Sequence, residues 1–196
     1  GSGDWNDGMN RVGHEGKGES VWLGWFLCAV VSDFAPLAQA RGDHSRADKW
    51  LAARQGWVAA LHEAGWDGAW FRRAFFDNGA ALGSSTNSEC RIDLIAQAWS
   101  VISGAAPPDR QQTAMQSMHT HLVDEQNGLI RLLDPPLRHA RPSAGYIQAY
   151  PPGVRENGGQ YTHAAVWTVM AFAESGQREK AWDLFSLINP VRHGST

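Results

Sequence analysis

Hydrophobic and polar residues are distributed along the chain in six blocks that have the length and periodicity of helices. Residues 19–34, 90–103 and 162–175 are apolar on nearly every side, whereas residues 44–64, 109–125 and 178–187 combine a narrower apolar stripe with charged and amide side chains. A narrow stripe predicts an amphipathic helix, and a helix that is apolar all round predicts a buried one. The order therefore predicts three pairs, each a buried helix followed by a half-exposed one.

Short and long connections alternate between these predicted helices. Within a pair the links are residues 40–43, 104–108 and 176–177, and each contains the glycine that a helix C-terminus favours. Asp43 and Asp109 are predicted to cap the second helix of their pairs. Between pairs, residues 65–89 and 126–161 form long links rich in Gly, Pro and Asn. Hairpins stacked in this way bring all their long loops to one end.

This arrangement predicts an all-α protein and is the pattern of half an (α/α)6 barrel, in which buried inner helices are wrapped by amphipathic outer ones. A solenoid of helical hairpins has the same pattern, but the chain lacks a fixed repeat period, and the long irregular loops favour the barrel. In either architecture the loops open the N-termini of the inner helices. Unpaired N–H groups and the helix dipole favour an anion there.

The composition is that of an ordinary globular domain, and it argues against nucleic acid as a partner. The 196 residues are 43% hydrophobic and 19% charged, with a net charge of −3, so there is no basic surplus for nucleic acid. Cys28 and Cys90 form neither a disulfide framework nor a metal-ligand spacing. The apolar run 21–31 is too short to span a bilayer, and the N-terminal residues do not resemble a signal peptide. We expect a cytoplasmic location.

The first motif whose side chains suit a binding or catalytic role is residues 3–10, GDWNDGMN. Segments of Asp, Asn and Gly are most often turns. The same groups also suit a sugar site, where carboxylates and amides bind hydroxyl groups and one carboxyl donates a proton to a glycosidic oxygen. Asp4 and Asp7 are then both candidates for the acid.

A second motif, residues 13–22, contains three glycines within six residues just before a predicted helix. Glycines at this density allow close backbone approach to a ligand, but the spacing matches no nucleotide-binding motif. Capping of the helix by Glu19 or Ser20 is the better interpretation.

The third motif, residues 146–163, sets Tyr146, Tyr150, Arg155 and Glu156 around a Pro-Pro-Gly turn and a Gly-Gly pair. His163 follows in the first turn of the next predicted helix. A histidine at a helix start is commonly structural, but combined with Arg155 and the helix N-terminus it predicts an anion pocket.

The runs GDWNDGMN, GKGESVWLGWF, ECRIDLIAQAWSVISG and YPPGVRENGGQYTHAAVW resemble the inverting glycoside phosphorylases that include cellobiose and chitobiose phosphorylases. Within that family they look most similar to the phosphorylase-like domain of cyclic β-1,2-glucan synthases and to 1,2-β-oligoglucan phosphorylases. The resemblance covers nearly the whole chain. It implies the C-terminal half of an (α/α)6 barrel, whose first half and extreme end we expect to lie outside these residues.

The resemblance also implies roles for individual residues. Asp7 matches the general acid, Trp5 lines the sugar site, and Tyr150, Arg155 and Glu156 lie near the acceptor sugar. His163 matches a phosphate ligand. Cellobiose phosphorylases tend to have Lys where this chain has Arg155, so acceptor recognition is expected to differ. The family's Thr-Gly phosphate ligands and an Arg from the first half of the barrel have no match here. The rest of the parent barrel, or a second copy of this chain, is therefore an expected partner.

The reaction that the resemblance implies is phosphorolysis of a β-linked glucan, with β-1,2 as the expected linkage, to α-glucose 1-phosphate, with inorganic phosphate as co-substrate and no cofactor or metal. Phosphate is already an anionic nucleophile, so a phosphorylase needs only the acid, whereas an inverting hydrolase also needs a base. A hydrolase is the first alternative, with Glu156 or Glu19 as its base. The second is a non-catalytic fragment that binds glucan or packs against a partner domain.

Overall fold

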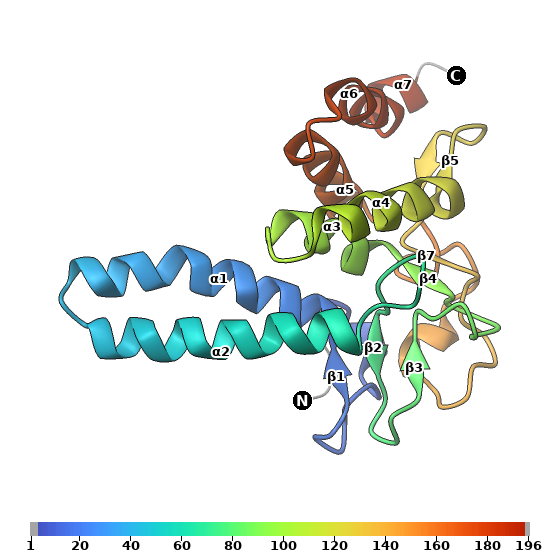
Figure 1. Ribbon diagram of the computed structural model, residues 1–196. Coiled ribbons are helices and arrows are strands. Elements are labelled where there is room, and N and C mark those ends of the chain that lie inside the picture. Colours follow the sequence, from blue (N-terminus) through green and yellow to red (C-terminus); the bar gives the residue numbers. More distant parts are fainter. Residues whose placement is uncertain (1–3, 195–196) are drawn as a thin grey trace.

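The computed structural model describes residues 4–194 and consists mainly of three helical hairpins (Figure 1). Helix α1 (Val21–Ala40) pairs with α2 (His44–Glu63), α3 (Leu94–Ile102) with α4 (Pro108–Leu122), and α5 (Thr162–Glu174) with α6 (Arg178–Leu187). The first helices of the hairpins also contact one another, α1 against α3 and α3 against α5. A short helix, α7 (Pro190–His193), follows. This confirms the predicted all-α class and the inner and outer rows of a half barrel.

Helix α3 lies at the centre of the main hydrophobic core. Every side chain from Leu94 to Val101 is buried, and the core continues into α1 through Trp22, Trp25 and Cys28 and into α5 through Phe172. The buried residues of α1 recur at helical spacing, so one side of this largely apolar helix faces the core. Both cysteines, Cys28 and Cys90, are free thiols in buried positions.

Helix α1 is longer than the sequence predicts, because it continues through Pro36 to Ala40 instead of ending at Phe34. A proline inside a helix removes one backbone hydrogen bond and costs about 3 kcal/mol. The last turns nevertheless pack on α2, where Val31 and Ala35 form a small core with Ala47. That packing favours continuation of the helix over the break expected at Pro36.

At 20 residues with a mean hydropathy of 1.6, α1 has the length and composition of a membrane-crossing helix. The expectation that no such segment exists was wrong by these two criteria, because it ended the helix too early. In the fold, α1 is a core helix of a helical hairpin, with Trp25 and Cys28 fully buried.

Two of the predicted helix caps are confirmed and one is wrong. Ser20 Oγ accepts a hydrogen bond from the backbone N–H of Leu23, and Asp43 accepts one from Arg46. The N-cap position of α4 is Pro107, not Asp109, because Pro108 occupies the first helical position, where its missing N–H causes no loss.

Residues 4–194 contain two-residue strands that the sequence did not predict, some in the long links and others at the ends of the predicted helices. They are β1 (Glu19–Ser20), β2 (Ala74–Phe75), β3 (Ala81–Leu82), β4 (Ile92–Asp93), β5 (Val123–Asp124), β6 (Leu129–Ile130) and β7 (Leu133–Asp134). All pairings are antiparallel: β2 lies between β1 and β3, β4 pairs with β7, and β5 with β6. The pairing of β4 delays the start of α3 to Leu94, and that of β5 ends α4 at Leu122, which shortens both predicted helices.

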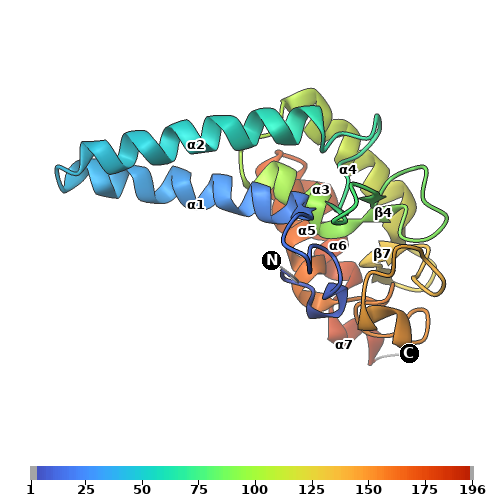
Figure 2. The ribbon, with the colours of Figure 1, turned by 90° about the horizontal axis from the view of Figure 1, so that it is seen from below.

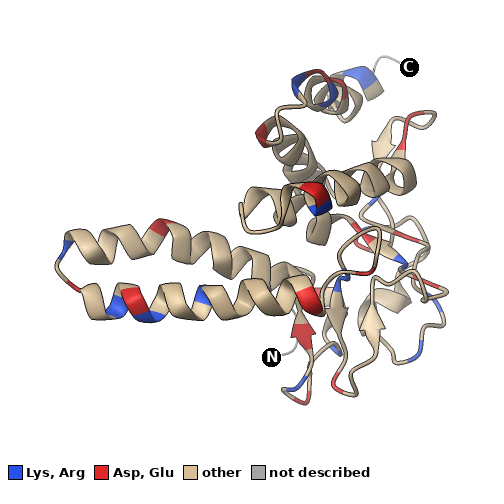
Figure 3. Cartoon of the chain, in the orientation of Figure 1, with Lys and Arg blue, Asp and Glu red and all other residues tan. Residues whose placement is uncertain are grey.

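Figures 1 and 2 show the α1–α2 hairpin extending away from the other elements, while β1 to β4, β7 and the long loops gather at its base. Charged residues are concentrated on α2 and nearly absent from α1 (Figure 3). One side of α1 remains apolar and uncovered, with Leu23, Phe34 and Leu37 exposed. The loop-rich base carries all three sequence motifs.

Candidate functional site

Asp7 begins a short 3-10 helix, η1 (Asp7–Met9), and its side chain is exposed. The preceding Asn6 is buried and caps this turn, because its Oδ1 accepts a hydrogen bond from the backbone N–H of Gly8 at 3.1 Å. Met9 anchors the other end of the turn in a second hydrophobic cluster with Ile147 and Leu137. The turn therefore holds the Asp7 carboxyl at the surface on a backbone fixed at both sides.

A second 3-10 turn, η2 (Tyr146–Ala149), packs directly against η1. The backbone N–H of Arg11 donates to the Ala144 carbonyl at 3.1 Å, and that of Tyr146 donates to Asn10 Oδ1 at 3.2 Å. Gly145 has a φ of 131°, and a Cβ there would lie 2.6 Å from the Gly8 carbonyl oxygen. Only glycine permits this approach, so the first motif packs against the residue that directly precedes the third motif.

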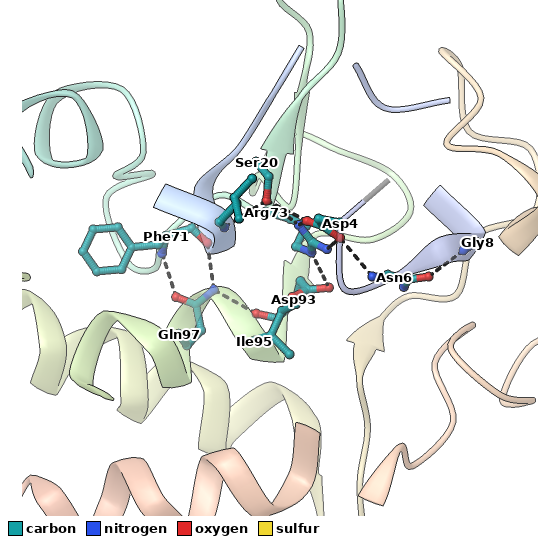
Figure 4. A network of polar contacts seen from close by, with 10 residues as sticks. Asp4, Asn6, Gly8, Ser20, Phe71, Arg73, Asp93, Ile95 and Gln97 are labelled. Carbon is teal, nitrogen blue, oxygen red and sulfur yellow. Dashed lines mark hydrogen bonds and ion pairs between the residues drawn. The ribbon is translucent and has the colours of Figure 1, made fainter. Parts of the chain in front are cut away.

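Asp4 is not free to act as an acid, because it is part of a buried ion network (Figure 4). The Arg73 guanidinium donates to both Asp4 carboxylate oxygens at 2.7 Å, and Ser20 Oγ donates to Oδ2 at 2.6 Å. On its other side, Arg73 Nε lies 3.4 Å from Oδ2 of Asp93. Arg73 and Asp93 are each 1% exposed.

This network pairs one guanidinium with two carboxylates, and the pKa values of the two carboxylates shift in opposite directions as a result. Burial alone would raise the pKa of Asp4, but the charge and hydrogen bonds of Arg73 lower it to about 2. Burial raises the pKa of Asp93 to about 6, because the attraction of Arg73 is opposed by the nearby Asp4 charge. Asp4 is therefore fully ionised near neutral pH, which leaves Asp7 as the carboxyl of the motif that is accessible to a ligand.

Trp5 reaches from this segment to the first turn of α5. Its indole Nε1–H donates to Nδ1 of His163 at 3.1 Å. The ring of His163 lies 4.2 Å from that of Trp167, and Trp5 contacts Tyr161 edge-on at 5.0 Å between ring centroids. His163 itself is exposed at the second position of α5. The predicted placement of His163 at a helix start is confirmed, and Trp5 brings it next to the acid motif.

The remaining predicted residues form a second group around the η2 turn. Arg155 lies over the Tyr150 ring at 4.8 Å and 3.4 Å from the Glu156 carboxylate, and the Tyr146 and Tyr150 rings are 6.0 Å apart. Arg155 has a φ of 52°, a left-handed conformation that is costly for a non-glycine residue and occurs often at functional sites.

Tyr146 connects this group to Asp7. Desolvation and then the negative charge of Asp7 raise the pKa of Tyr146, with smaller contributions from Tyr150 and Glu156. Tyr146 is 46% exposed and lines a cavity of about 580 Å³ together with Asn10, Arg11 and Arg141. Asp7, Trp5 and His163 on one side and Tyr150, Arg155 and Glu156 on the other therefore belong to one end of the molecule.

Glu19, an alternative base in the sequence interpretation, has a different environment. It lies in β1, is exposed, and lines a cavity at the base of the α1–α2 hairpin with Leu23, Trp57 and Phe75. None of the residues around Tyr146 lines that cavity. Within residues 4–194, no group of three or more His, Cys, Asp or Glu side chains is arranged to hold a metal ion.

The roles of Arg73 and Asp93 were not predicted from the sequence. Arg73 binds Asp4, at the start of the segment that carries Trp5 and Asp7 (the acid segment), and Asp93 lies next to Arg73. Arg73 stands in the long link 65–89 beside Arg72, and nothing in that pattern distinguishes a buried guanidinium from an exposed one. The one available signal was Asp93, an isolated acid between apolar residues at the start of a buried helix, where only a cap or a paired charge is expected.

The site thus combines an exposed carboxyl on a turn with the aromatic ring of Trp5 and a histidine in the first turn of α5, on a domain built from paired helices. The chain belongs to the glycosyl hydrolase 94 superfamily, whose catalytic-domain model matches residues 1–196.

Curated relatives extend this assignment. The chain is 52% identical to cyclic beta-(1,2)-glucan synthase NdvB of Rhizobium meliloti (strain 1021), over 97% of the chain and 7% of that protein. It is 35% identical to solabiose phosphorylase of Paenibacillus borealis and 31% identical to cellobionic acid phosphorylase of Neurospora crassa, each over 96% of the chain and 24% of the relative. The chain thus spans a quarter or less of the length of these relatives.

Proposed function

We propose that the chain contributes the general acid and part of the phosphate site to an inverting glycoside phosphorylase domain that acts on β-1,2-linked glucan. The observation that carries this proposal is the hydrogen bond from Trp5 to His163, because it joins the Asp7 segment to the exposed first turn of α5. A proton donor and an anion site side by side are what phosphorolysis requires. The β-1,2 linkage is inferred from the 52% identity to cyclic beta-(1,2)-glucan synthase NdvB.

In the proposed reaction, Asp7 donates its proton to the glycosidic oxygen while a phosphate oxygen attacks the anomeric carbon from the opposite face. The bond between the anomeric carbon and the leaving sugar breaks, which gives α-glucose 1-phosphate and a glucan one unit shorter. His163 and the N–H groups of the first turn of α5 bind the phosphate. Solvent then reprotonates the Asp7 carboxylate.

The acceptor sugar is proposed to lie over the Tyr150 and Arg155 group. The Tyr150 ring offers an apolar face to a sugar ring, and Glu156 can accept hydrogen bonds from hydroxyl groups. Because Arg155 already contacts both of these residues, it orients them as well as contacting the ligand.

A hydrolase would need Glu156 as a base with room for a water molecule beside the sugar. The Glu156 side chain is only 12% exposed, and its Oε2 lies 3.4 Å from Arg155 Nε. With so little of this carboxylate exposed, there is little room for a water molecule between it and a sugar, which favours phosphate over water as the nucleophile.

The test uses the full-length protein that carries this chain and measures turnover of β-1,2-glucan with and without inorganic phosphate, following glucose 1-phosphate and free reducing sugar separately. Asp7→Asn keeps the shape of the side chain but removes the acidic proton, so we expect activity to fall by about 10²- to 10⁴-fold. Asp48→Asn, an exposed acid on the far hairpin, is the matched control. Equal turnover without phosphate would replace the phosphorylase proposal with a hydrolase.

We further propose that inorganic phosphate is the only co-substrate, that no organic cofactor or metal takes part, and that the remainder of the barrel is the partner that completes the site. A cytoplasmic location, on the inner side of the membrane if the parent is a membrane protein, fits the two free buried thiols. Cell fractionation of the tagged full-length protein, with protease protection, tests the location.

A further inference from the structure

The hydrogen bond between Trp5 and His163 has a defined direction. An indole N–H can only donate, so the atom that it meets, Nδ1 of His163, must accept. An imidazole nitrogen accepts only when it carries no proton. The neutral His163 ring in this arrangement therefore has its proton on Nε2, the nitrogen that Trp5 does not contact.

The two rings are also held in place by their neighbours. Trp167, one turn further along α5, lies 4.2 Å from His163 and 5.7 Å from Trp5 between ring centroids. Trp167 in turn packs against Trp22 and Trp99 of the main core. The His163 ring thus rests on an aromatic cluster that leads into the buried centre of the molecule.

The far side of the His163 ring is open. His163 is exposed, and the N-cap residue of α5, Tyr161, makes no side-chain hydrogen bond to the first turn. The Nε2–H of His163 and the first backbone N–H groups of this turn are therefore donors that remain available to a ligand.

We propose that Trp5 is a positioning residue, which holds His163 in the tautomer protonated on Nε2 and directs that N–H toward the bound phosphate. The proposal rests on the proposed function for the identity of the anion. It assigns to Trp5 a role through His163, in addition to any contact with sugar. Since Asp7 lies two residues from Trp5, the same bond sets the position of the anion ligand relative to the acid.

A role limited to lining the sugar site makes different predictions. If Trp5 only contacts sugar, its loss raises the KM for glucan and leaves both the phosphate KM and the His163 tautomer unchanged. If Trp5 positions His163, its loss raises the KM for phosphate and changes the tautomer.

The tautomer is measured directly on this 196-residue chain with ¹⁵N-labelled histidine, and the His163 signals are those absent from His163→Gln. We expect a protonated Nε2 and an unprotonated Nδ1 at pH 8, and a mixed population in Trp5→Phe, which removes the donor. Trp167→Phe, which alters the aromatic packing but keeps the Trp5 donor, is expected to retain the wild-type tautomer. A wild-type ring protonated on Nδ1, or a tautomer unaffected by Trp5→Phe, would overturn the proposal even if Trp5→Phe proves inactive.

The kinetic test uses the full-length protein with inorganic phosphate. We expect Trp5→Phe to raise the phosphate KM by about 3- to 10-fold, the equivalent of one lost hydrogen bond. In a His163→Ala background the same substitution should add no further increase in the phosphate KM, because the residue through which Trp5 acts is absent. An equal additional increase in that background would mean that Trp5 acts independently of His163. Turnover that ignores phosphate would instead defeat the proposed function, and the tautomer measurement would then decide the role of Trp5 alone.

Discussion

Arg73 and Asp4 form a bidentate ion pair between positions 69 residues apart, with both nitrogen–oxygen distances at 2.7 Å. The pair lies almost entirely out of solvent and fixes the start of the segment that carries Trp5 and Asp7. A guanidinium matches a carboxylate through two parallel hydrogen bonds, which restrains orientation as well as distance. The position of the candidate acid is therefore set by a charge pair beneath it.

Removing one partner of this pair should be costly, because it leaves Arg73 with an incomplete set of acceptors. We expect Asp4→Asn to lower the free energy of unfolding by about 3 to 5 kcal/mol. Asp43→Asn is the matched control, since Asp43 pairs with Arg46 at the surface and Asn still caps α2, so its loss should stay below about 1 kcal/mol. Denaturant unfolding followed by circular dichroism measures both. Equal losses in the two variants would contradict the role given to the buried pair.

Asp93 should make the protein less stable as the pH rises from 4 to 6. Its pKa is raised to about 6 in the fold from an ordinary 3.8, so the folded state binds the proton more tightly, and the resulting stabilisation is lost through pH 6. Asp93→Asn keeps the cap on the Ile95 N–H and removes the titration. We expect the decrease in unfolding free energy over this range to be smaller in Asp93→Asn, by about 1 to 3 kcal/mol. An unchanged slope in the variant would assign it to other groups.

Asp4 should have the opposite effect in acid. Its pKa is lowered to about 2 from 3.8, so its stabilising contribution is complete above pH 4 and is lost as the pH falls from 4 to 2. Unfolding curves at pH 5, 3.5 and 2.5 should converge for the wild type and Asp4→Asn as the pH decreases. A constant difference between them would show that Asp4 does not titrate in this range.

Gly145→Ala should disturb the acid segment, because a Cβ at this position meets Asn10 and the Gly8 carbonyl. We expect a loss of phosphorolysis in the full-length protein beyond the change in melting temperature alone. Gly153→Ala controls for backbone strain, since Gly153 also has a positive φ and no atom lies within 4 Å of its Cβ position. Activity reduced to the same extent in both variants would attribute the effect to φ and not to the contact between η1 and η2.

The exposed apolar side of α1 should cause the isolated chain to self-associate. Leu23, Phe34 and Leu37 together form the kind of surface that soluble monomers rarely leave uncovered. Sedimentation velocity should show dimers or larger species, and Phe34→Glu with Leu37→Gln should shift them toward monomer. Trp182→Gln, on the exposed side of α6, tests whether any surface aromatic has this effect. A monodisperse wild-type monomer that binds no hydrophobic dye would remove this expectation.

The pairing of helices could be predicted from the sequence because it depends on local periodicity. The buried character of α3 follows from its run of apolar residues, and Asp43 marks the start of α2 by a cap that acts within one turn. The strands could not be predicted, since each has only two residues, too few to show an alternating pattern, and the β1–β2 and β4–β7 pairings join segments far apart in the sequence. The pairing of Ile92 with Asp134 is an example, and it shortened a predicted helix.

The candidate site was predictable to the extent that its residues cluster in motifs. Trp5, Asp7 and His163 were selected by motif and resemblance, but the sequence left open whether Asp4 or Asp7 is the acid. That choice depends on Arg73, whose buried position is set by the β1–β2–β3 sheet and by the N-terminus of α3. A charge balance of this kind is a property of tertiary structure and has no local signature.

The 158 positions that separate Trp5 from His163 impose an order on biosynthesis. A nascent chain that has emerged as far as α4 already contains Asp7, yet it lacks Tyr146, which contacts the Asp7 segment, and His163, which Trp5 orients. Synthesis proceeds from the N-terminus at about 5 to 20 residues per second, so the Asp7 turn is synthesised about 7 to 30 seconds before Tyr146 and His163. The candidate site is thus complete only when translation of this region is nearly finished, and a polypeptide that ends before α5 lacks the proposed phosphate ligand.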